Sequence, residues 1–222
     1  MTRWIAIAFG VVAVALGAYF YLGAGTQSTP ANPLGAAQAG TDVEFGDVIE
    51  MQIGDPDAPV TMIEYASYTC PHCARFHNGP YKQLKADYID TGKVNFIYRE
   101  VYFDRFGLWA SAIARCAGPE RFFGITDQLY KTQSDWTRAG GGDPSAIVDE
   151  LRKIGRVSGL GSDQIEACLQ DGEQLQRLVA WYQHNAEQDD ISSTPSFVIN
   201  GKKYNNMAYD ELRSVLDDAA NG

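Results

Sequence analysis

The sequence predicts an α/β fold in which one sheet domain is interrupted by an all-helical insertion. Short strand-like runs occur between residues 49 and 101 and again between residues 196 and 204. From about residue 106 to residue 188, apolar residues instead recur at helical spacing almost throughout. Strand patterns on both sides of a helical block indicate a sheet that the chain leaves and later re-enters.

The N-terminal residues form a separate apolar segment. Residues 4–22 contain no charge, Arg3 precedes them, and the next charged residue is Asp42. A run of this length can span a bilayer. Residues 1–23 are therefore interpreted as an uncleaved membrane anchor or a cleaved signal peptide, with a buried core helix as the third alternative. The positive-inside rule places Arg3 in the cytoplasm and the rest of the chain outside it.

The composition is that of an acidic globular protein with a polar tether. A flexible linker is expected over residues 24–42, which are rich in glycine, alanine, serine, threonine and proline. The chain has 222 residues, and 45% of them are hydrophobic, which is ordinary for a globular protein. Its formal net charge of -10 argues against nucleic acid and against an anionic membrane surface as partners.

The first two strands lead up to a pair of cysteines. Apolar and polar residues alternate over residues 49–53, which is typical of a half-buried strand. Residues 60–66 form a short, mostly apolar run and are expected to be a buried strand that ends just before Cys70. A helix is expected from the cysteines to about Asp90, followed by a third strand over residues 94–101.

Capping residues mark helix boundaries inside the insertion. Asp143 is expected to cap a helix that begins at Pro144, because proline suits the first helical position. Ser162 is expected to cap a shorter helix, and Gly172 is expected to close it.

The strands resume after the insertion. Residues 196–199 are expected to pair with residues 202–204 through a hairpin turn at Asn200-Gly201, and residues 209–219 to form a terminal helix. The predicted domains are a discontinuous sheet domain, residues 43–105 and 186–222, and an inserted helical domain, residues 106–185.

The stretch Cys70-Pro71-His72-Cys73 lies between the buried strand and the helix that follows. This position puts Cys70 at a helix N-terminus, where unpaired N–H groups and the helix dipole favour a thiolate. Because the thiolate is the form that attacks disulfides, the pair is predicted to be a redox-active dithiol of oxidising character. Pro71 suits the first helical turn, and His72 is expected to add a donor or a positive charge near the Cys70 sulfur.

A C-x-x-C motif has two other interpretations. It can be half of a zinc site, and His72 and His77 lie nearby in the sequence. It can also be an inert structural disulfide. The chain has no second C-x-x-C and its remaining histidine, His184, is isolated, so no metal or other cofactor is expected.

Two positions outside the motif are further candidates. Glu64 lies in the apolar strand, where a carboxylate is costly unless it is paired or functional, and it could relay protons to Cys73. The alternative is a carboxylate exposed at a strand edge. Thr194-Pro195 directly precedes a hydrophobic strand and is a candidate cis bond that would present backbone groups to an extended substrate. The alternative there is an ordinary trans-proline.

Two stretches of the chain resemble one protein family. Residues 63–73, Ile-Glu-Tyr-Ala-Ser-Tyr-Thr-Cys-Pro-His-Cys, resemble the active-site region of DsbA-like thiol:disulfide oxidoreductases. Residues 193–201, Ser-Thr-Pro-Ser-Phe-Val-Ile-Asn-Gly, resemble that family's cis-proline segment and the hairpin after it. The resemblance covers about residues 43–220 and includes the helical insertion. It implies a thioredoxin-like fold and a periplasmic enzyme that introduces disulfides into exported proteins.

The resemblance also assigns a role to each residue of the site. Cys70 is expected to be the exposed cysteine that attacks and accepts, and Cys73 the buried cysteine that resolves. His72 is expected to tune Cys70, Glu64 to be the buried acid, and Pro195 to be the cis-proline.

The family resemblance further implies partners and a location. The expected partners are unfolded or reduced exported proteins and a membrane oxidase of the DsbB type. The chain is expected to act as a monomer in the periplasm, held at the inner membrane by residues 4–22 if that segment stays uncleaved.

The sequence departs from the best-known members of the family at two places. Thr194 stands where those oxidases carry valine, while disulfide isomerases of the DsbC and DsbG type carry threonine. The chain also has a second cysteine pair, Cys116 and Cys168, which is expected to form a structural disulfide, with two separate buried thiols as the alternative. Closing a loop of that length contributes about 4 kcal/mol in the chain-entropy model.

Three functions therefore remain open at this point. The motif and the extracytoplasmic context favour a dithiol oxidase. Thr194 favours a disulfide isomerase or reductase, although residues 24–42 are too short for the N-terminal dimerisation domain of such isomerases. A non-catalytic module that binds or carries a metal is the third.

Overall fold

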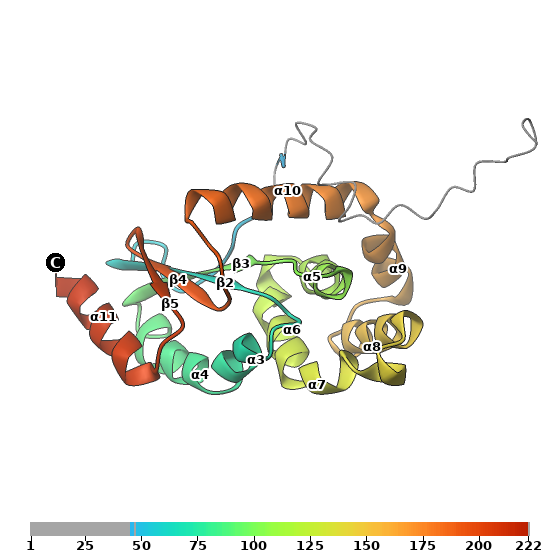
Figure 1. Cartoon of the computed structure of the whole chain (residues 1–222), viewed down its shortest axis with the longest axis horizontal. Helices are drawn as coiled ribbons and strands as arrows, with labels where there is room; N and C mark the ends of the chain where they lie inside the picture. The colour runs from blue at the N-terminus through green and yellow to red at the C-terminus, as the bar shows by residue number, and fades with distance from the viewer. Residues whose placement is uncertain (1–44, 47, 222) are drawn as a thin grey trace, which may run out of the picture. The chain divides into compact units, whose positions relative to one another are not determined.

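The computed structural model describes residues 45, 46 and 48–221 (Figure 1). The expected anchor or signal peptide at residues 1–23 and the expected linker at residues 24–42 lie outside this part of the chain. Within it, no helix combines the length and the apolar character needed to cross a bilayer.

A five-stranded mixed sheet forms the centre of the fold, with β2 between a parallel and an antiparallel neighbour. The strand order is β1-β3-β2-β4-β5. Central β2 is covered on both faces, which is why its sequence is a nearly continuous apolar run. The strands are β1 (Met51–Ile53), β2 (Val60–Ala66), β3 (Val94–Glu100), β4 (Ser196–Ile199) and β5 (Lys202–Asn205).

The strands lie where the sequence predicts them, although β1 and β3 are shorter than expected and β5 is one residue longer. β1 begins at Met51, and Ile49 lies before it with 57% of its surface exposed. The hairpin between β4 and β5 turns at Asn200 and Gly201, whose φ angles of 44° and 81° are both positive. Two positive φ angles match the right-handed twist of the flanking strands, and asparagine and glycine are the residues that adopt them most readily.

The helix after the cysteines is broken, whereas the sequence pattern predicts one continuous helix. It consists of α3 (Pro71–Asn78), α4 (Pro80–Leu84) and a π-helical turn η1 (Lys85–Ile89). The break falls at Gly79, which has φ -131° and ψ -93°. Pro80 has no N–H to donate to the preceding turn, so the helix ends there and restarts.

The inserted block is helical throughout, and Asp143 caps α8 as predicted by accepting a hydrogen bond from the N–H of Ala146. The boundaries around α9 differ from the prediction. Gly161, not Ser162, is its N-cap residue, and Gly172 begins the next helix because the Asp171 carboxylate caps that helix. The helices are α5 (Arg105–Cys116), α6 (Pro119–Lys131), α7 (Gln133–Trp136), the 3-10 turn η2 (Ala139–Gly141), α8 (Pro144–Val157) and α9 (Ser162–Gln170).

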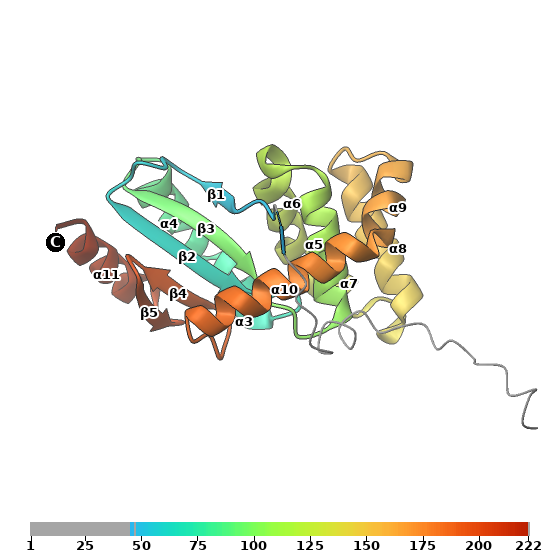
Figure 2. The ribbon, with the colours of Figure 1, turned by 90° about the horizontal axis from the view of Figure 1, so that it is seen from above.

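One long helix, α10 (Gly172–Gln188), connects the helical block with the sheet. Figure 2 shows it passing over both, and Figure 1 shows it on the face of the sheet opposite α3, α4 and the terminal helix α11 (Tyr209–Asn221). Leu175 and Leu178 pack with Leu108 of α5, while Tyr182 packs against the sheet beside Tyr65. The expected domain boundary between residues 185 and 186 falls inside this continuous helix.

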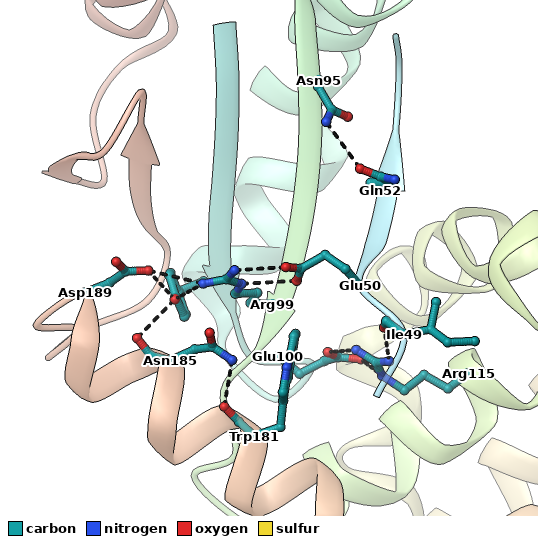
Figure 3. Close-up of polar contacts among 11 residues, drawn as sticks. Ile49, Glu50, Gln52, Asn95, Arg99, Glu100, Arg115, Trp181, Asn185 and Asp189 are labelled. Carbon is teal, nitrogen blue, oxygen red and sulfur yellow. Dashed lines mark hydrogen bonds and ion pairs between the residues drawn. The ribbon is translucent and has the colours of Figure 1, made fainter. Parts of the chain in front are cut away.

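Ion pairs, partly buried at Arg99 and buried at Arg115, join the sheet to the helices on the α10 side (Figure 3). Arg99 of β3 holds Glu50 through two hydrogen bonds of 3.1 and 2.9 Å and reaches Asp189 at 3.2 Å. The neighbouring Glu100 is held by Arg115 of α5 in the same paired manner, at 2.7 and 2.6 Å. Paired guanidinium–carboxylate contacts fix direction as well as distance, so they set how the insertion meets the sheet.

The second cysteine pair is a disulfide within the helical block. Cys116, the last residue of α5, is bonded to Cys168 of α9, and their Cα atoms lie 5.9 Å apart. The bond closes a loop with a sequence separation of 52 residues. Neither cysteine therefore takes part in the site formed by the other two, which are free thiols.

Candidate active site

Cys70 and Cys73 occupy the first turn of α3, at the end of central β2. Cys70 is the N-cap residue, with an extended backbone (φ -81°, ψ 118°), and Pro71 is the first helical residue. Cys73 is completely buried, whereas Cys70 keeps 8% of its surface exposed. The expectation of an exposed Cys70 is therefore wrong in degree, because the Thr194 segment lies over its sulfur.

The segment over Cys70 contains a cis peptide bond between Thr194 and Pro195. The carbonyl oxygen of Thr194 accepts a hydrogen bond from the Cys70 Sγ at 3.6 Å. The hydroxyl oxygen of Thr194 is buried and has no hydrogen-bond partner among the described residues. The structure thus brings Cys70 together with Thr194 and Pro195, which follow it in the sequence by more than 120 residues.

Two residues that sequence reasoning missed hold the active-site loop against the insertion. The Gln133 side-chain amide of α7 donates to the carbonyl oxygens of Tyr68 at 2.8 Å and Cys70 at 2.9 Å. Asp104 accepts from the Thr69 hydroxyl at 2.8 Å while it caps α5. An aspartate before a helical pattern is a recognisable cap signal, but nothing local marks Gln133.

The two thiols have opposite acid strengths. Donation from the Cys73 thiol, helped by the backbone N–H groups of Cys73 and His72, lowers the pKa of Cys70 from 9.0 to about 5 against the opposing effect of burial. Burial raises the pKa of Cys73 far above its ordinary value, and the hydrogen bond to Cys70 and the charge of Glu64 raise it further. At neutral pH the pair therefore consists of a Cys70 thiolate and a protonated Cys73.

The His72 side chain contacts Arg75. Its Nδ1 lies 2.7 Å from the Arg75 Nη2 on the exposed side of α3. A guanidinium only donates hydrogen bonds, so Nδ1 is the acceptor in this contact. Among the contacts that favour the Cys70 thiolate, His72 contributes through its backbone N–H, which is fixed by its place in the first helical turn.

Glu64 is fully buried, so the alternative of an exposed carboxylate at a strand edge is wrong. Its Oε2 lies 2.8 Å from the Nε2 of His77, which is itself 2% exposed, and its Oε1 has no partner among the described residues. His77 entered the sequence argument only as a metal-ligand candidate. Among the described residues no group of three or more histidine, cysteine, aspartate or glutamate side chains is placed to hold a metal ion.

The depressed pKa of Cys70 predicts how the reduced protein responds to pH. The folded-state value of about 5 lies below the ordinary 9.0, so the resulting stabilisation is complete above pH 9 and is lost as the pH falls through 5. At pH 7 it amounts to about 3 kcal/mol. Thiolate absorbance at 240 nm should show a midpoint near pH 5, and the stability advantage of reduced over oxidised protein should shrink between pH 7 and pH 5. A thiolate midpoint near 9 would contradict this prediction.

Comparisons with known proteins agree with this geometry. A family profile described as thioredoxin matches residues 47–218. A Rickettsia bellii protein named "Putative protein-disulfide oxidoreductase" is 30% identical over 174 residues, which cover 78% of this chain and 65% of that protein. Disulfide bond formation protein D of Bacillus subtilis is 25% identical over 180 residues and 77% of each chain. This chain spans 60–65% of the length of its rickettsial relatives.

The solved structures point to the same family. The crystal structure of Wolbachia pipientis α-DsbA1 superposes with a TM-score of 0.71 at 28% identity, and the match covers 78% of this chain and 91% of that one. The predicted thioredoxin-like fold with a helical insertion is confirmed. The chain belongs to the thioredoxin family and, within that family, is DsbA-like.

Proposed function

We propose that this chain is a periplasmic thiol:disulfide oxidoreductase that introduces disulfides into exported proteins through Cys70 and Cys73. The observation that carries the proposal is the unequal pair of thiols, with the pKa of Cys70 lowered to about 5 beside a buried, protonated Cys73. The names of the rickettsial and Bacillus relatives support the same chemistry.

The proposed reaction transfers two electrons from a substrate dithiol to the Cys70–Cys73 disulfide. A substrate thiolate attacks the Cys70 Sγ, the bond between the two protein sulfurs breaks, and Cys73 leaves and takes up a proton. The second substrate thiolate then attacks the substrate sulfur of the mixed disulfide, and Cys70 leaves as a thiolate. The substrate becomes a disulfide and the protein a dithiol, with one proton on Cys73.

The acid strength of Cys70 favours this direction. A thiol of low pKa is the better leaving group, so the mixed disulfide breaks readily toward oxidised substrate. Every contact that stabilises the Cys70 thiolate also stabilises the reduced protein, which makes its disulfide the stronger oxidant. The hydrogen bond from the Cys73 thiol and the N–H groups of the helix N-terminus act in this way.

The cis-Pro195 segment is the proposed substrate-binding strand. The Thr194 carbonyl already lies at hydrogen-bond distance from Cys70, so an extended peptide whose cysteine reacts there would run beside this backbone. Main-chain pairing of that kind accepts many sequences, which suits an enzyme that acts on unfolded or reduced exported proteins.

The surroundings of the enzyme belong to the same proposal. We expect a DsbB-type membrane oxidase to reoxidise the dithiol and the chain to act as a monomer. The apolar residues 4–22 support export to the periplasm, either as a cleaved signal or as an inner-membrane anchor.

The deciding experiment is equilibration of the Cys70/Cys73 pair with glutathione redox buffers. We expect a potential on the oxidising side of the glutathione couple, and rapid oxidation of a reduced peptide that contains two cysteines. A potential as reducing as that of thioredoxin, about -270 mV, would refute disulfide donation.

Thr194 favours one alternative, a disulfide isomerase or reductase that uses the same site. Reactivation of scrambled ribonuclease distinguishes the two functions. Strong reactivation with weak peptide oxidation would favour the isomerase, whereas the reverse pattern supports the oxidase.

A further inference from the structure

Glu64 and His77 form a buried hydrogen-bonded pair near the dithiol, and the exchange steps described above do not use it. Glu64 projects from central β2 and His77 from α3, and their Oε2 and Nε2 atoms lie 2.8 Å apart. The side chains are 0% and 3% exposed. An isolated carboxylate at such depth is strongly disfavoured, whereas an N–H that donates to it favours its charged form.

The pair is held in place by aromatic packing. The His77 ring stacks on Tyr130 of α6 at 4.2 Å between centroids and 19° between planes. Tyr130 is in turn hydrogen-bonded to Tyr98 of β3 at 2.6 Å between hydroxyl oxygens. With its ring fixed, His77 aims Nε2 at one carboxylate oxygen of Glu64 and leaves the other, Oε1, without a partner among the described residues.

The titratable groups around the pair come from four elements. The Glu64 charge raises the pKa values of Cys73 and Tyr81, so both groups lie within its field. The neutral phenols have pKa values above the ordinary range, so they do not titrate between pH 5 and 9. The groups are Cys73 of α3, Tyr81 of α4, Tyr98 of β3 and Tyr130 of α6.

We propose that His77 is a positioning residue for Glu64, the buried acid expected to relay the Cys73 proton: it holds Oε2 at 2.8 Å and leaves Oε1 free to accept that proton when Cys73 attacks. The inference rests on the proposed thiol–disulfide exchange but not on its direction. When the reduced protein meets a disulfide, Cys70 forms a mixed disulfide and one thiolate leaves. The Cys73 proton then passes to Glu64, the Cys73 sulfur bonds to the Cys70 Sγ, and the second thiolate leaves.

The charge balance explains why a paired acid is suited to this step. Before the proton transfer the buried negative charge is on the Glu64 carboxylate. After the transfer the charge is on the Cys73 sulfur. Cys73 loses the charge when it forms the disulfide. During this step Glu64 and Cys73 are never both anionic, a state that burial would penalise heavily. In substrate oxidation the same proton returns from the pair to the departing Cys73.

The test follows the two steps separately in the full chain. Reduced protein is mixed with glutathione disulfide, quenched in acid at intervals and analysed by mass spectrometry from pH 5 to pH 9. In the His77→Phe variant, which keeps an aromatic ring beside Tyr130, we expect the mixed disulfide to form at a normal rate. Its resolution should slow about tenfold near pH 6.5, because the pH midpoint of that step rises by about one unit or more.

Two further variants separate positioning from packing. His77→Gln retains an N–H donor toward Glu64 and should fold. The pH midpoint of its resolution step should lie closer to the wild-type midpoint than that of His77→Phe does. Tyr130→Phe removes a buried hydrogen bond near the pair but no titrating group, so it should cost stability and leave the midpoint unchanged. If His77→Phe resolves the mixed disulfide with the wild-type midpoint, the role of His77 is refuted. If wild-type protein forms no mixed disulfide, the exchange chemistry itself is refuted.

Discussion

Replacing Cys70 by serine is expected to abolish disulfide transfer, with a loss on the order of a thousandfold or more in the rate of peptide oxidation. Serine cannot form the mixed disulfide, and Cys73 cannot substitute for Cys70. Cys73 is completely buried, and burial raises its pKa so far that it stays protonated at neutral pH. The measurement is the initial rate at which stoichiometric protein oxidises a reduced two-cysteine peptide.

Two control variants make this prediction specific. Cys73→Ser should still react once through Cys70 and accumulate a stable mixed disulfide with the peptide, visible on non-reducing gels. Joint replacement of Cys116 and Cys168 by serine should lower thermal stability but preserve transfer, because their disulfide lies in the helical block away from Cys70. Transfer by the Cys70→Ser variant, or its loss in the Cys116/Cys168 variant, would contradict the assignment of the redox pair.

Replacing Arg115 by leucine is expected to lower the free energy of unfolding by about 3–5 kcal/mol. The Arg115 guanidinium holds both oxygens of Glu100 and donates to the carbonyl oxygen of Ile49 at 2.9 Å (Figure 3). The Glu100 side chain is 1% exposed, so the substitution leaves a buried carboxylate whose remaining side-chain partner is the Ser111 hydroxyl at 2.9 Å. Urea denaturation of oxidised protein measures the loss.

The chain contains a matched control for the Arg115 substitution. Arg152 holds Glu166 through the same two-bond geometry, at 2.6 and 2.9 Å, but the side chains are 32% and 39% exposed. Water can solvate a carboxylate at such a site, so Arg152→Leu should cost about 1 kcal/mol or less. Equal losses for the two variants would show that burial of Glu100 does not govern the stability of this interface.

Much of the fold follows from patterns of a few residues. The bounds of β2 and β4, the turn at Asn200-Gly201 and the Asp143 cap were predictable because each depends on neighbours within about four positions. The predictions failed where two local signals compete. Gly79-Pro80 ends a helix that apolar spacing alone would continue, and the Asp171 carboxylate starts a new helix where Gly172 suggested only an end.

In the active site, too, some features follow from neighbouring residues and others depend on tertiary packing. The sequence places Cys70 at a helix N-terminus and Cys73 one turn further, because strand and helix adjoin in the chain. It could not show that Gln133, 63 residues away, fixes the Cys70 carbonyl, or that the His72 ring turns toward Arg75. Those outcomes depend on which side chains the packing of α7 and the exposed face of α3 bring together.

The sequence by itself therefore determined the chemistry of this protein: a dithiol at a helix N-terminus after a buried strand, followed far downstream by a threonine–proline segment. The tertiary structure decided how the two thiols differ. It places Thr194 over Cys70, buries Cys73 completely and sets the Glu64–His77 pair behind it. Acid strength depends on solvent exclusion and on charges within a few ångströms, and only the folded chain brings distant residues to those distances.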